Sequence, residues 1–303
     1  MKTKVVLWLV VVCLIWGSTW LAIKIGLATV PPLLAAGLRF LLASLILYGM
    51  MLVRKENLPP GRPFRILVVI LGLTAFSIPY ALVYWGQRLI PSALSSILFA
   101  SYPFFVAIFS HLFLPEERMT GLKLLGVLLG FVGVYVIFSS ELAFDTNVAV
   151  GGMAAIVISA LIQAGSLVYL KRYGQAFSPI SLNFVSMSIG ALLLLLGSVT
   201  TENYATVVFT NKAVLSILFL ALFGNVVAFV SYFWLVKHVE TVLLAMTSFV
   251  TPIIAVTLGA AILGESLSHR IFSGATLVLC GILAANGKDL AKLLASGKAL
   301  LWD

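Results

Sequence analysis

Charged side chains are scarce in this chain. Of its 303 residues only 10% are charged, whereas 62% are hydrophobic and the mean hydropathy is +1.15. Soluble domains carry about 25% charged residues, so a chain this apolar cannot hide its surface from water in a single core. We therefore expect a membrane protein, in which lipid surrounds the apolar side chains.

Cysteine and histidine are also few, and their placement excludes several kinds of site. Both cysteines, Cys13 and Cys280, lie within apolar runs, so the sequence predicts neither a disulfide framework nor a metal site. The 3 histidines are scattered, with no acidic neighbour inside a run, and no Walker-type phosphate loop is present. We accordingly expect no enzyme activity and no bound cofactor.

The apolar runs have the length of transmembrane helices. They extend over roughly 18–22 residues without alternating polarity, which suits a helix crossing the bilayer and is too long for a barrel strand. The net charge of +9 does not indicate a nucleic-acid partner, because the basic residues stand singly at the ends of the runs. The predicted spans are residues 5–23, 33–53, 66–87, 92–113, 122–139, 150–170, 180–199, 213–236, 242–263 and 271–287.

Lysine and arginine also predict the orientation of these spans. With ten spans and a cytoplasmic N-terminus, Arg39 lies inside a span and only four of the 19 basic residues face outward. These four are Lys24, Arg88, Lys212 and Arg270. The first apolar run has no signal-peptide cleavage site, so we expect it to be retained as a helix. The sequence thus predicts a multi-pass inner-membrane protein with both termini in the cytoplasm.

The two halves of the chain carry similar residues at an offset of 147 to 149 positions. Because each half has an odd number of spans, the second half must enter the membrane from the opposite side. We predict an all-α membrane protein of ten transmembrane helices in two inverted five-helix repeats, residues 1–140 and 148–288, followed by a tail at 289–303. The paired residues are Lys24 with Lys171, Pro32 with Pro179, Trp85 with Trp234, Pro103 with Pro252, and, after a shift of one, Glu117, Gly126 and Gly133 with Glu265, Gly274 and Gly281.

These motifs together resemble the EamA family of the drug/metabolite transporter superfamily. The resemblance implies the ten-helix fold, alternating access and a central cavity for amino acids, other metabolites or drugs. The second repeat departs from the first, with Gln163 in place of Trp16 and Ser186 in place of Arg39. The motifs that carry the resemblance are Trp16-Gly17-Ser18-Thr19-Trp20, Leu38-Arg39-Phe40, Pro115-Glu116-Glu117 and Gly264-Glu265.

Polar and aromatic side chains within the spans are candidates for the cavity wall, because polar groups that face lipid are costly. The alternative is that Ser and Thr bond their own helix backbone and that Tyr lies in an interfacial belt. The candidate substrate-binding residues are Trp16, Ser18, Arg39, Tyr80, Tyr84, Ser101, Tyr102, Gln163, Asn225, Tyr232, Ser248 and Thr251. Pro79, Pro103 and Pro252 are candidate hinges, with static bends as the equal alternative.

Arg39 has two interpretations. It can bind a substrate carboxylate, or it can snorkel to the outer face or bond backbone carbonyls, and its closeness to the span end favours the second. Packing is the expected role of five glycines, whose spacing suits close contact between helices. These are Gly126, Gly130, Gly133, Gly274 and Gly281.

The 10 acidic residues all fall in loops or at span ends, so no carboxylate is expected at membrane depth. This argues against ion coupling through such a group and against polycationic substrates. We hypothesise an exporter of small organic metabolites such as amino acids, and a resemblance to the YddG members of the family implies aromatic ones. The alternatives are a multidrug or other metabolite efflux transporter and a facilitative, channel-like permease. The expected partners are the solute and the lipid bilayer, with a monomer as the simplest assembly.

Overall fold

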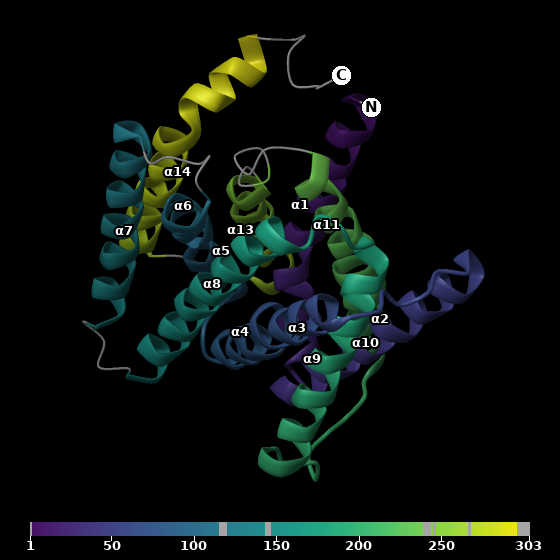
Figure 1. Ribbon diagram of the computed structural model, residues 1–303. Helices are drawn as coiled ribbons and strands as arrows, with labels where there is room; N and C mark the ends of the chain where they lie inside the picture. Colours follow the sequence, from purple (N-terminus) through teal and green to yellow (C-terminus); the bar gives the residue numbers. More distant parts are fainter. Residues whose placement is uncertain are drawn as a thin grey trace.

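A computed structural model describes residues 2–114, 120–142, 147–238, 244, 247–265 and 268–295, which form helices joined by short connections (Figure 1). Within these ranges there is no β-strand. The helices are α1 (Lys2–Gly26), α2 (Pro32–Arg54), α3 (Arg62–Leu71), η1 (Gly72–Ser77), α4 (Ile78–Leu89), α5 (Ser92–Phe99), α6 (Tyr102–Phe113), α7 (Gly121–Leu142), α8 (Asn147–Tyr173), α9 (Pro179–Thr201), α10 (Asn211–Phe219), η2 (Leu220–Val227), α11 (Ala228–His238), α13 (Thr247–Leu263) and α14 (His269–Ala295).

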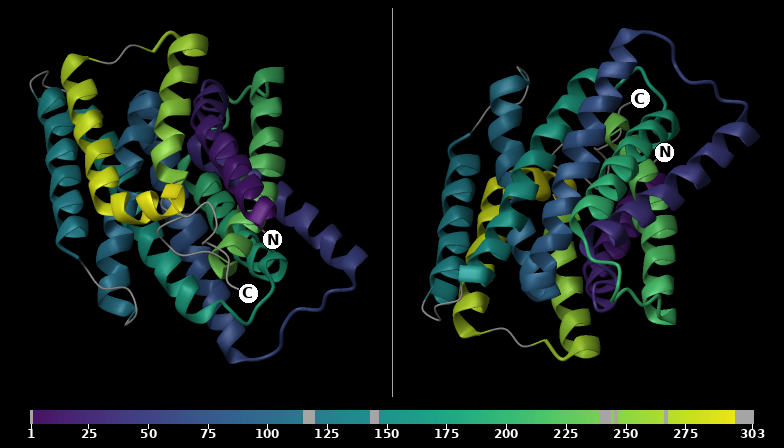
Figure 2. Two further views of the ribbon diagram at one scale, coloured as in Figure 1. Left: turned by 90° about the horizontal axis from the view of Figure 1, so that it is seen from above. Right: turned by 90° about the horizontal axis from the view of Figure 1, so that it is seen from below.

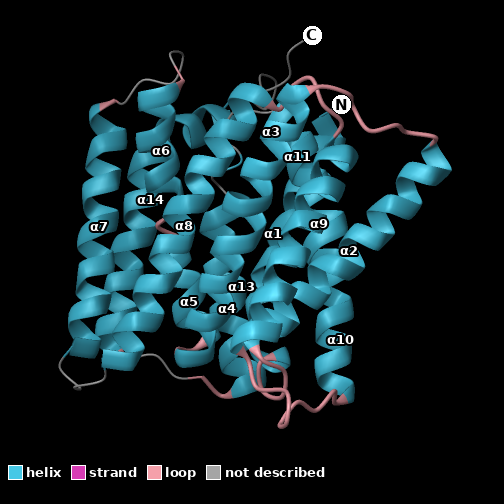
Figure 3. Ribbon diagram, turned by 60° about the horizontal axis from the view of Figure 1, so that its bottom comes forward, coloured by secondary structure: helices cyan, strands magenta, loops and turns pink. Residues whose placement is uncertain are grey.

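Many of these helices are long and apolar enough to cross a membrane, and Figure 3 shows them lying side by side. The described residues contain 7 such segments, together with two shorter apolar helices, Gly121–Ile137 and Val250–Leu263. The prediction of a helical membrane protein is therefore confirmed. The 7 segments are Leu7–Gly26, Pro32–Arg54, Arg62–Leu89, Ser92–Phe113, Val148–Tyr173, Pro179–Thr201 and Asn211–His238.

Two of the long segments change their hydrogen-bond pattern part-way along. The π-helix η1 joins α3 to α4, and the π-helix η2 joins α10 to α11; their first residues, Gly72 and Leu220, lie 148 positions apart. A π segment widens the helix locally and is frequent at functional sites. Both segments contribute buried residues to the interior of the bundle.

The three candidate hinge prolines occupy different positions. Pro79 lies in the first turn of α4, directly after η1, and Pro103 lies in the first turn of α6, after the break that separates α5 from α6. Proline supplies no N–H to the helix ladder, which agrees with the change in backbone hydrogen bonding at both positions. Pro252 lies inside the continuous helix α13. Pro79 thus follows a π-helix and Pro103 follows a helix break.

Neighbouring helices pack in pairs that are distant in sequence (Figure 2). α7 lies along α14 and α2 lies along α9, while α1 packs on α13 and α8 packs on α4 and α6. The α7–α14 contact is very close: a Cβ atom on Gly133 would lie 2.6 Å from the Gly274 carbonyl oxygen, and one on Gly281 would lie 2.6 Å from the Gly126 carbonyl oxygen. The expected packing role of these glycines is confirmed.

Carboxylates at the ends of α2 and α9 join the two helices. Glu202, just after α9, accepts hydrogen bonds from the backbone N–H groups of Leu33 (2.7 Å) and Leu34 (2.9 Å) in the first turn of α2. At the other end, Glu56 accepts a hydrogen bond from the Ser181 hydroxyl in the first turn of α9. A carboxylate stabilises a helix N-terminus because the free N–H groups there carry partial positive charge.

Candidate substrate pocket

A cavity of about 110 Å³ lies at the centre of the bundle, and most of its lining is apolar or aromatic. A cavity of about 150 Å³ holds benzene, so this space is close to the size that one small ring needs. The residues that line it come from α1, α2, α3, η1, α4, α5, α6, α8, α11 and α13. They are Trp16, Thr19, Trp20, Ile23, Arg39, Leu71, Ala75, Tyr80, Val83, Phe99, Tyr102, Gln163, Ser166, Leu167, Leu170, Phe229, Tyr232, Phe233, Thr247 and Thr251.

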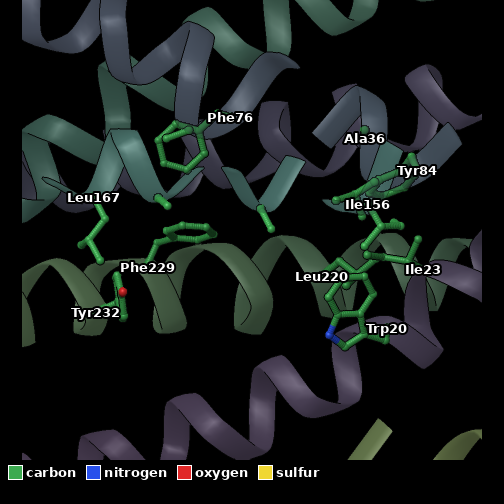
Figure 4. Close-up of a cluster of buried hydrophobic side chains, with 14 of the residues drawn as sticks. Trp20, Ile23, Ala36, Phe76, Tyr84, Ile156, Leu167, Leu220, Phe229 and Tyr232 are labelled. Carbon is green, nitrogen blue, oxygen red and sulfur yellow. The ribbon is translucent and has the colours of Figure 1, made fainter. Parts of the chain in front are cut away.

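One side of the cavity is an aromatic wall between α1 and α11. The Trp16 ring lies 5.3 Å from the Phe229 ring and 4.8 Å from the Tyr232 ring, measured between centroids. The Trp16 indole also donates a hydrogen bond to the Gly224 carbonyl oxygen at 3.4 Å. Figure 4 shows Phe229 and Tyr232 on α11, with Phe76 of η1 facing Phe229. Tilted and edge-to-face rings pack well with further aromatic groups.

A second part of the lining is formed around the break between α5 and α6. Tyr102 follows this break, and its hydroxyl lies 3.3 Å from the Tyr232 hydroxyl, which connects α6 to α11. The Phe99 ring stacks on Tyr102 at 5.7 Å, and Trp20 packs on Phe99 at 5.4 Å. The interruption in the helix thus allows aromatic side chains from both of its short pieces to reach the cavity.

Arg39 lies in the interior, so the interpretation that it snorkels to the outer face is wrong, whereas it does join α2 to other helices, through side chains in the described contacts. Only 1% of its surface is exposed. Its Nη1 donates a hydrogen bond to the Tyr84 hydroxyl at 3.3 Å, and its Nη2 donates to the Asn225 side-chain oxygen. The guanidinium carbon also lies 5.0 Å from the centre of the Tyr80 ring. These partners come from α4 and η2, which are distant from α2 along the chain.

The structure brings many of the predicted substrate-binding residues to the cavity. Tyr84 and Asn225 contact Arg39 from outside the lining. Ser18 and Ser101 bond carbonyl oxygens of their own helices, Ile15 at 2.8 Å and Leu98 at 2.7 Å, as the backbone alternative predicted. The side chain of Ser248 lies outside the described part of the chain. The predicted residues in the lining are Trp16, Arg39, Tyr80, Tyr102, Gln163, Tyr232 and Thr251.

Apolar lining residues were missing from the predicted set because the search was guided mainly by polar groups. Helical spacing could have found several of them. Trp20 follows Trp16 by four positions and Phe229 precedes Tyr232 by three, so each pair lies on one face of its helix. The apolar residues that the prediction omitted are Trp20, Ile23, Leu71, Ala75, Val83, Phe99, Leu167, Leu170, Phe229 and Phe233.

Next to the cavity, polar contacts tie several helix ends together. The Glu265 carboxylate, just after α13, accepts hydrogen bonds from the Ser92 N–H (2.8 Å), the Ser92 hydroxyl (2.8 Å) and the Ala93 N–H (2.9 Å) at the start of α5. Lys24 donates to the carbonyl oxygens of Gln87 and Ile90, both at 2.8 Å. We call these contacts, made by Lys24 and Glu265, the end clamp.

The end clamp borders the cavity directly. Gln87, whose carbonyl oxygen Lys24 holds, also donates a side-chain hydrogen bond to the carbonyl oxygen of Trp20, a lining residue. Ile23, immediately before Lys24, lines the cavity as well. The end clamp therefore joins α1, α4, α5 and the chain after α13 at one end of the solute space.

Apolar helices around a central aromatic cavity define a multi-pass membrane protein with an interior site for a small solute. The chain belongs to the EamA-like transporter family, whose model matches residues 3–139 and again residues 150–287. The resemblance drawn from the sequence motifs is thereby confirmed, and the protein is a membrane transporter.

Similar proteins of known sequence cover nearly the whole chain. It is 31% identical to the uncharacterized transporter YvbV of Bacillus subtilis, over 97% of this chain and 95% of that protein. It is 29% identical to the uncharacterized transporter YoaV of the same organism (92% and 95%) and 30% identical to the uncharacterized inner membrane transporter YedA of Escherichia coli (91% and 89%). One solved crystal structure has the same fold, with a TM-score of 0.71 at 20% identity over 98% of this chain and 100% of that chain.

Proposed function

We propose that the protein exports small organic metabolites, foremost amino acids with aromatic side chains, by alternating access. The observation that carries this proposal is the central cavity, whose lining includes eight Trp, Tyr and Phe rings. Such rings bind another ring by stacking and edge contacts. Among the described residues that line the cavity, Arg39 is the one charged group and no carboxylate is present, which disfavours cationic drugs.

The proposed architecture is ten spans in two inverted repeats, residues 1–140 and 148–288, followed by a tail at 289–303. Four observations support it. The family model matches twice along the chain, and π-helices occur 148 positions apart. Glu56 and Glu202 form reciprocal contacts between α2 and α9. α1 packs on α13 as α6 packs on α8. Inverted repeats of this kind build transporters whose two states exchange the roles of the halves.

We propose that the end clamp closes the outer end of the cavity. In the topology predicted by the positive-inside rule, both termini lie in the cytoplasm, and Lys24 and Glu265 face outward. The repeat pairs them with Lys171 and Glu117 at the inner end, and Glu117 lies outside the described residues. We propose that the two ends open in turn and that the π-helix before Pro79, the helix break before Pro103 and Pro252 accommodate the movement. One relative is named as an inner membrane transporter, which supports the same membrane for this chain.

Flux measurements test the proposed function. Purified protein in liposomes should release preloaded radiolabelled phenylalanine, tyrosine or tryptophan faster than protein-free liposomes, with a rate that saturates as the internal concentration rises. Ethidium in a parallel experiment represents cationic drugs. Failure to move any amino acid contradicts the proposal, flux of ethidium alone supports the multidrug alternative, and unitary currents in a planar bilayer support a channel.

Trp16→Ala should raise the half-saturating concentration for aromatic amino acids about tenfold. The substitution removes a ring from the cavity wall and leaves Phe229 and Tyr232 without their neighbour. Half-saturating concentrations for tryptophan and alanine would be measured in the same preparation. The matched control is Trp85→Ala, which removes an exposed tryptophan outside the cavity lining. An equal loss for both solutes, or an effect of similar size in the control, would contradict a ring-binding role for Trp16.

A further inference from the structure

Arg39 is a buried cation that the described part of the chain does not neutralise. Its side chain is 1% exposed, and its hydrogen-bond partners, Tyr84 and Asn225, are both uncharged. A charge buried at membrane depth is costly unless an opposite charge pairs with it. Since Arg39 also lines the central cavity, the space beside it is where an anionic group of the solute would be most strongly stabilised.

The donors of Arg39 are incompletely used. A guanidinium carries five N–H groups, and the described contacts engage one each of Nη1 and Nη2, whereas Nε is buried with no hydrogen-bond partner. A carboxylate matches this fork because its two oxygens can accept two parallel N–H bonds. From this geometry we infer that Arg39 binds the carboxylate of the transported solute, an inference that rests on the proposed transport of amino acids.

Neighbouring groups hold the guanidinium in place. Asn225 accepts from Nη2 and donates back to the Arg39 carbonyl oxygen at 3.3 Å, which fixes both ends of the residue. A Cβ atom on Gly224 would lie 3.1 Å from Nη2, so glycine at this position leaves room for the charged group. Tyr80 and Phe40 place their rings 5.0 and 5.3 Å from the guanidinium carbon. Tyr84 and Asn225 are therefore positioning residues, and a preorganised donor binds its anion more tightly than a mobile one.

The two charged groups of an amino acid should be recognised unequally. The carboxylate meets Arg39, whereas the described lining offers the ammonium group no acid, only ring faces and hydroxyl or carbonyl oxygens. The carboxylate should therefore dominate the affinity. An aromatic carboxylate that lacks the amine, 3-phenylpropanoate, should bind about as well as phenylalanine, while phenethylamine, which lacks the carboxylate, should bind poorly.

Isothermal titration calorimetry of the purified protein with these three ligands tests the inference. In the wild type we expect phenylalanine and 3-phenylpropanoate to bind at least about tenfold more tightly than phenethylamine. Arg39→Gln should lower the first two affinities to that of phenethylamine and leave phenethylamine unchanged. The affinities of Arg39→Lys for the two carboxylates should lie between those of the wild type and those of Arg39→Gln, because a lysine supplies charge without the fork of donors. Arg88→Gln is the control, since Arg88 is an exposed arginine at the end of α4, and the wild-type ranking should persist.

The wild-type ranking alone can overturn the inference, so a failure of Arg39→Gln to fold does not remove the test. Equal affinities for phenethylamine and 3-phenylpropanoate, or no binding of 3-phenylpropanoate, show that Arg39 does not select a carboxylate. If the ligands rank as expected but the protein moves no amino acid in liposomes, the carboxylate site stands and amino-acid export is discarded. If amino acids are transported but Arg39→Gln leaves the ranking unchanged, export stands and the carboxylate site is discarded.

Discussion

Replacement of Glu265 by alanine should make the central cavity reachable from the end of the bundle where the end clamp lies, with at least about a tenfold faster reaction of a cavity cysteine with a membrane-impermeant thiol reagent. The Glu265 carboxylate accepts hydrogen bonds from two backbone N–H groups and one hydroxyl at the start of α5. A hydrogen bond to a charged group contributes about 1.5–3 kcal/mol, so the loss of three biases the end clamp strongly toward the open state.

The labelling experiment needs one reactive cysteine. In a background with Cys13→Ala and Cys280→Ala, Ile23→Cys places a thiol in the cavity lining beside Lys24. Glu202→Ala is the matched control, because Glu202 also binds two N–H groups at a helix start but joins α2 to α9 away from the end clamp. Equal rates with and without Glu265→Ala would show that the end clamp does not restrict access.

Gly133→Leu should destabilise the folded protein strongly. The added side chain would start 2.6 Å from the Gly274 carbonyl oxygen and 2.8 Å from the Val278 backbone nitrogen, and backbone atoms of α14 cannot rotate out of the way. Overpacking inside a filled core costs about 1–3 kcal/mol, and α7 would also have to separate from α14 along the seam. We expect a markedly lower melting temperature in detergent, or no recovery of a monodisperse protein.

Gly121→Leu gives the comparison within the same helix. A Cβ atom at Gly121 would meet nothing within 4 Å, and the residue is exposed at the start of α7. Size-exclusion profiles before and after heating would be compared for the two variants and the wild type. If Gly133→Leu melts within a few degrees of Gly121→Leu, the close contact between α7 and α14 does not contribute to stability.

The positions of the helices could be read from local patterns. The predicted span at 33–53 is α2 at 32–54, and the predicted span at 92–113 coincides with α5 and α6. Glycine spacing also predicted a close helix contact, which α7 and α14 make. Such features are predictable because helix length, hydropathy and the absence of a side chain are properties of a short stretch of chain.

The polar network around the cavity could be predicted only in part. Arg39 and Asn225 were both candidates, but their hydrogen bond joins residues 186 positions apart. Proximity to the span end favoured a snorkelling Arg39, because the sequence could not reveal that η2 and α4 supply buried partners. Glu265 was visible as part of the repeat, whereas its hydrogen bonds to Ser92 and Ala93 follow from the meeting of α13 and α5.

The sequence by itself determined that this chain forms apolar helices in a membrane and belongs with EamA-like transporters. In lipid each helix must satisfy its backbone hydrogen bonds internally, so length and hydropathy suffice to place it. The tertiary structure alone decided which side chains face the cavity, that Arg39 is buried without a described acidic partner, and which helices the end clamp joins. Those outcomes depend on contacts between helices far apart in sequence, for which local chain properties carry no information.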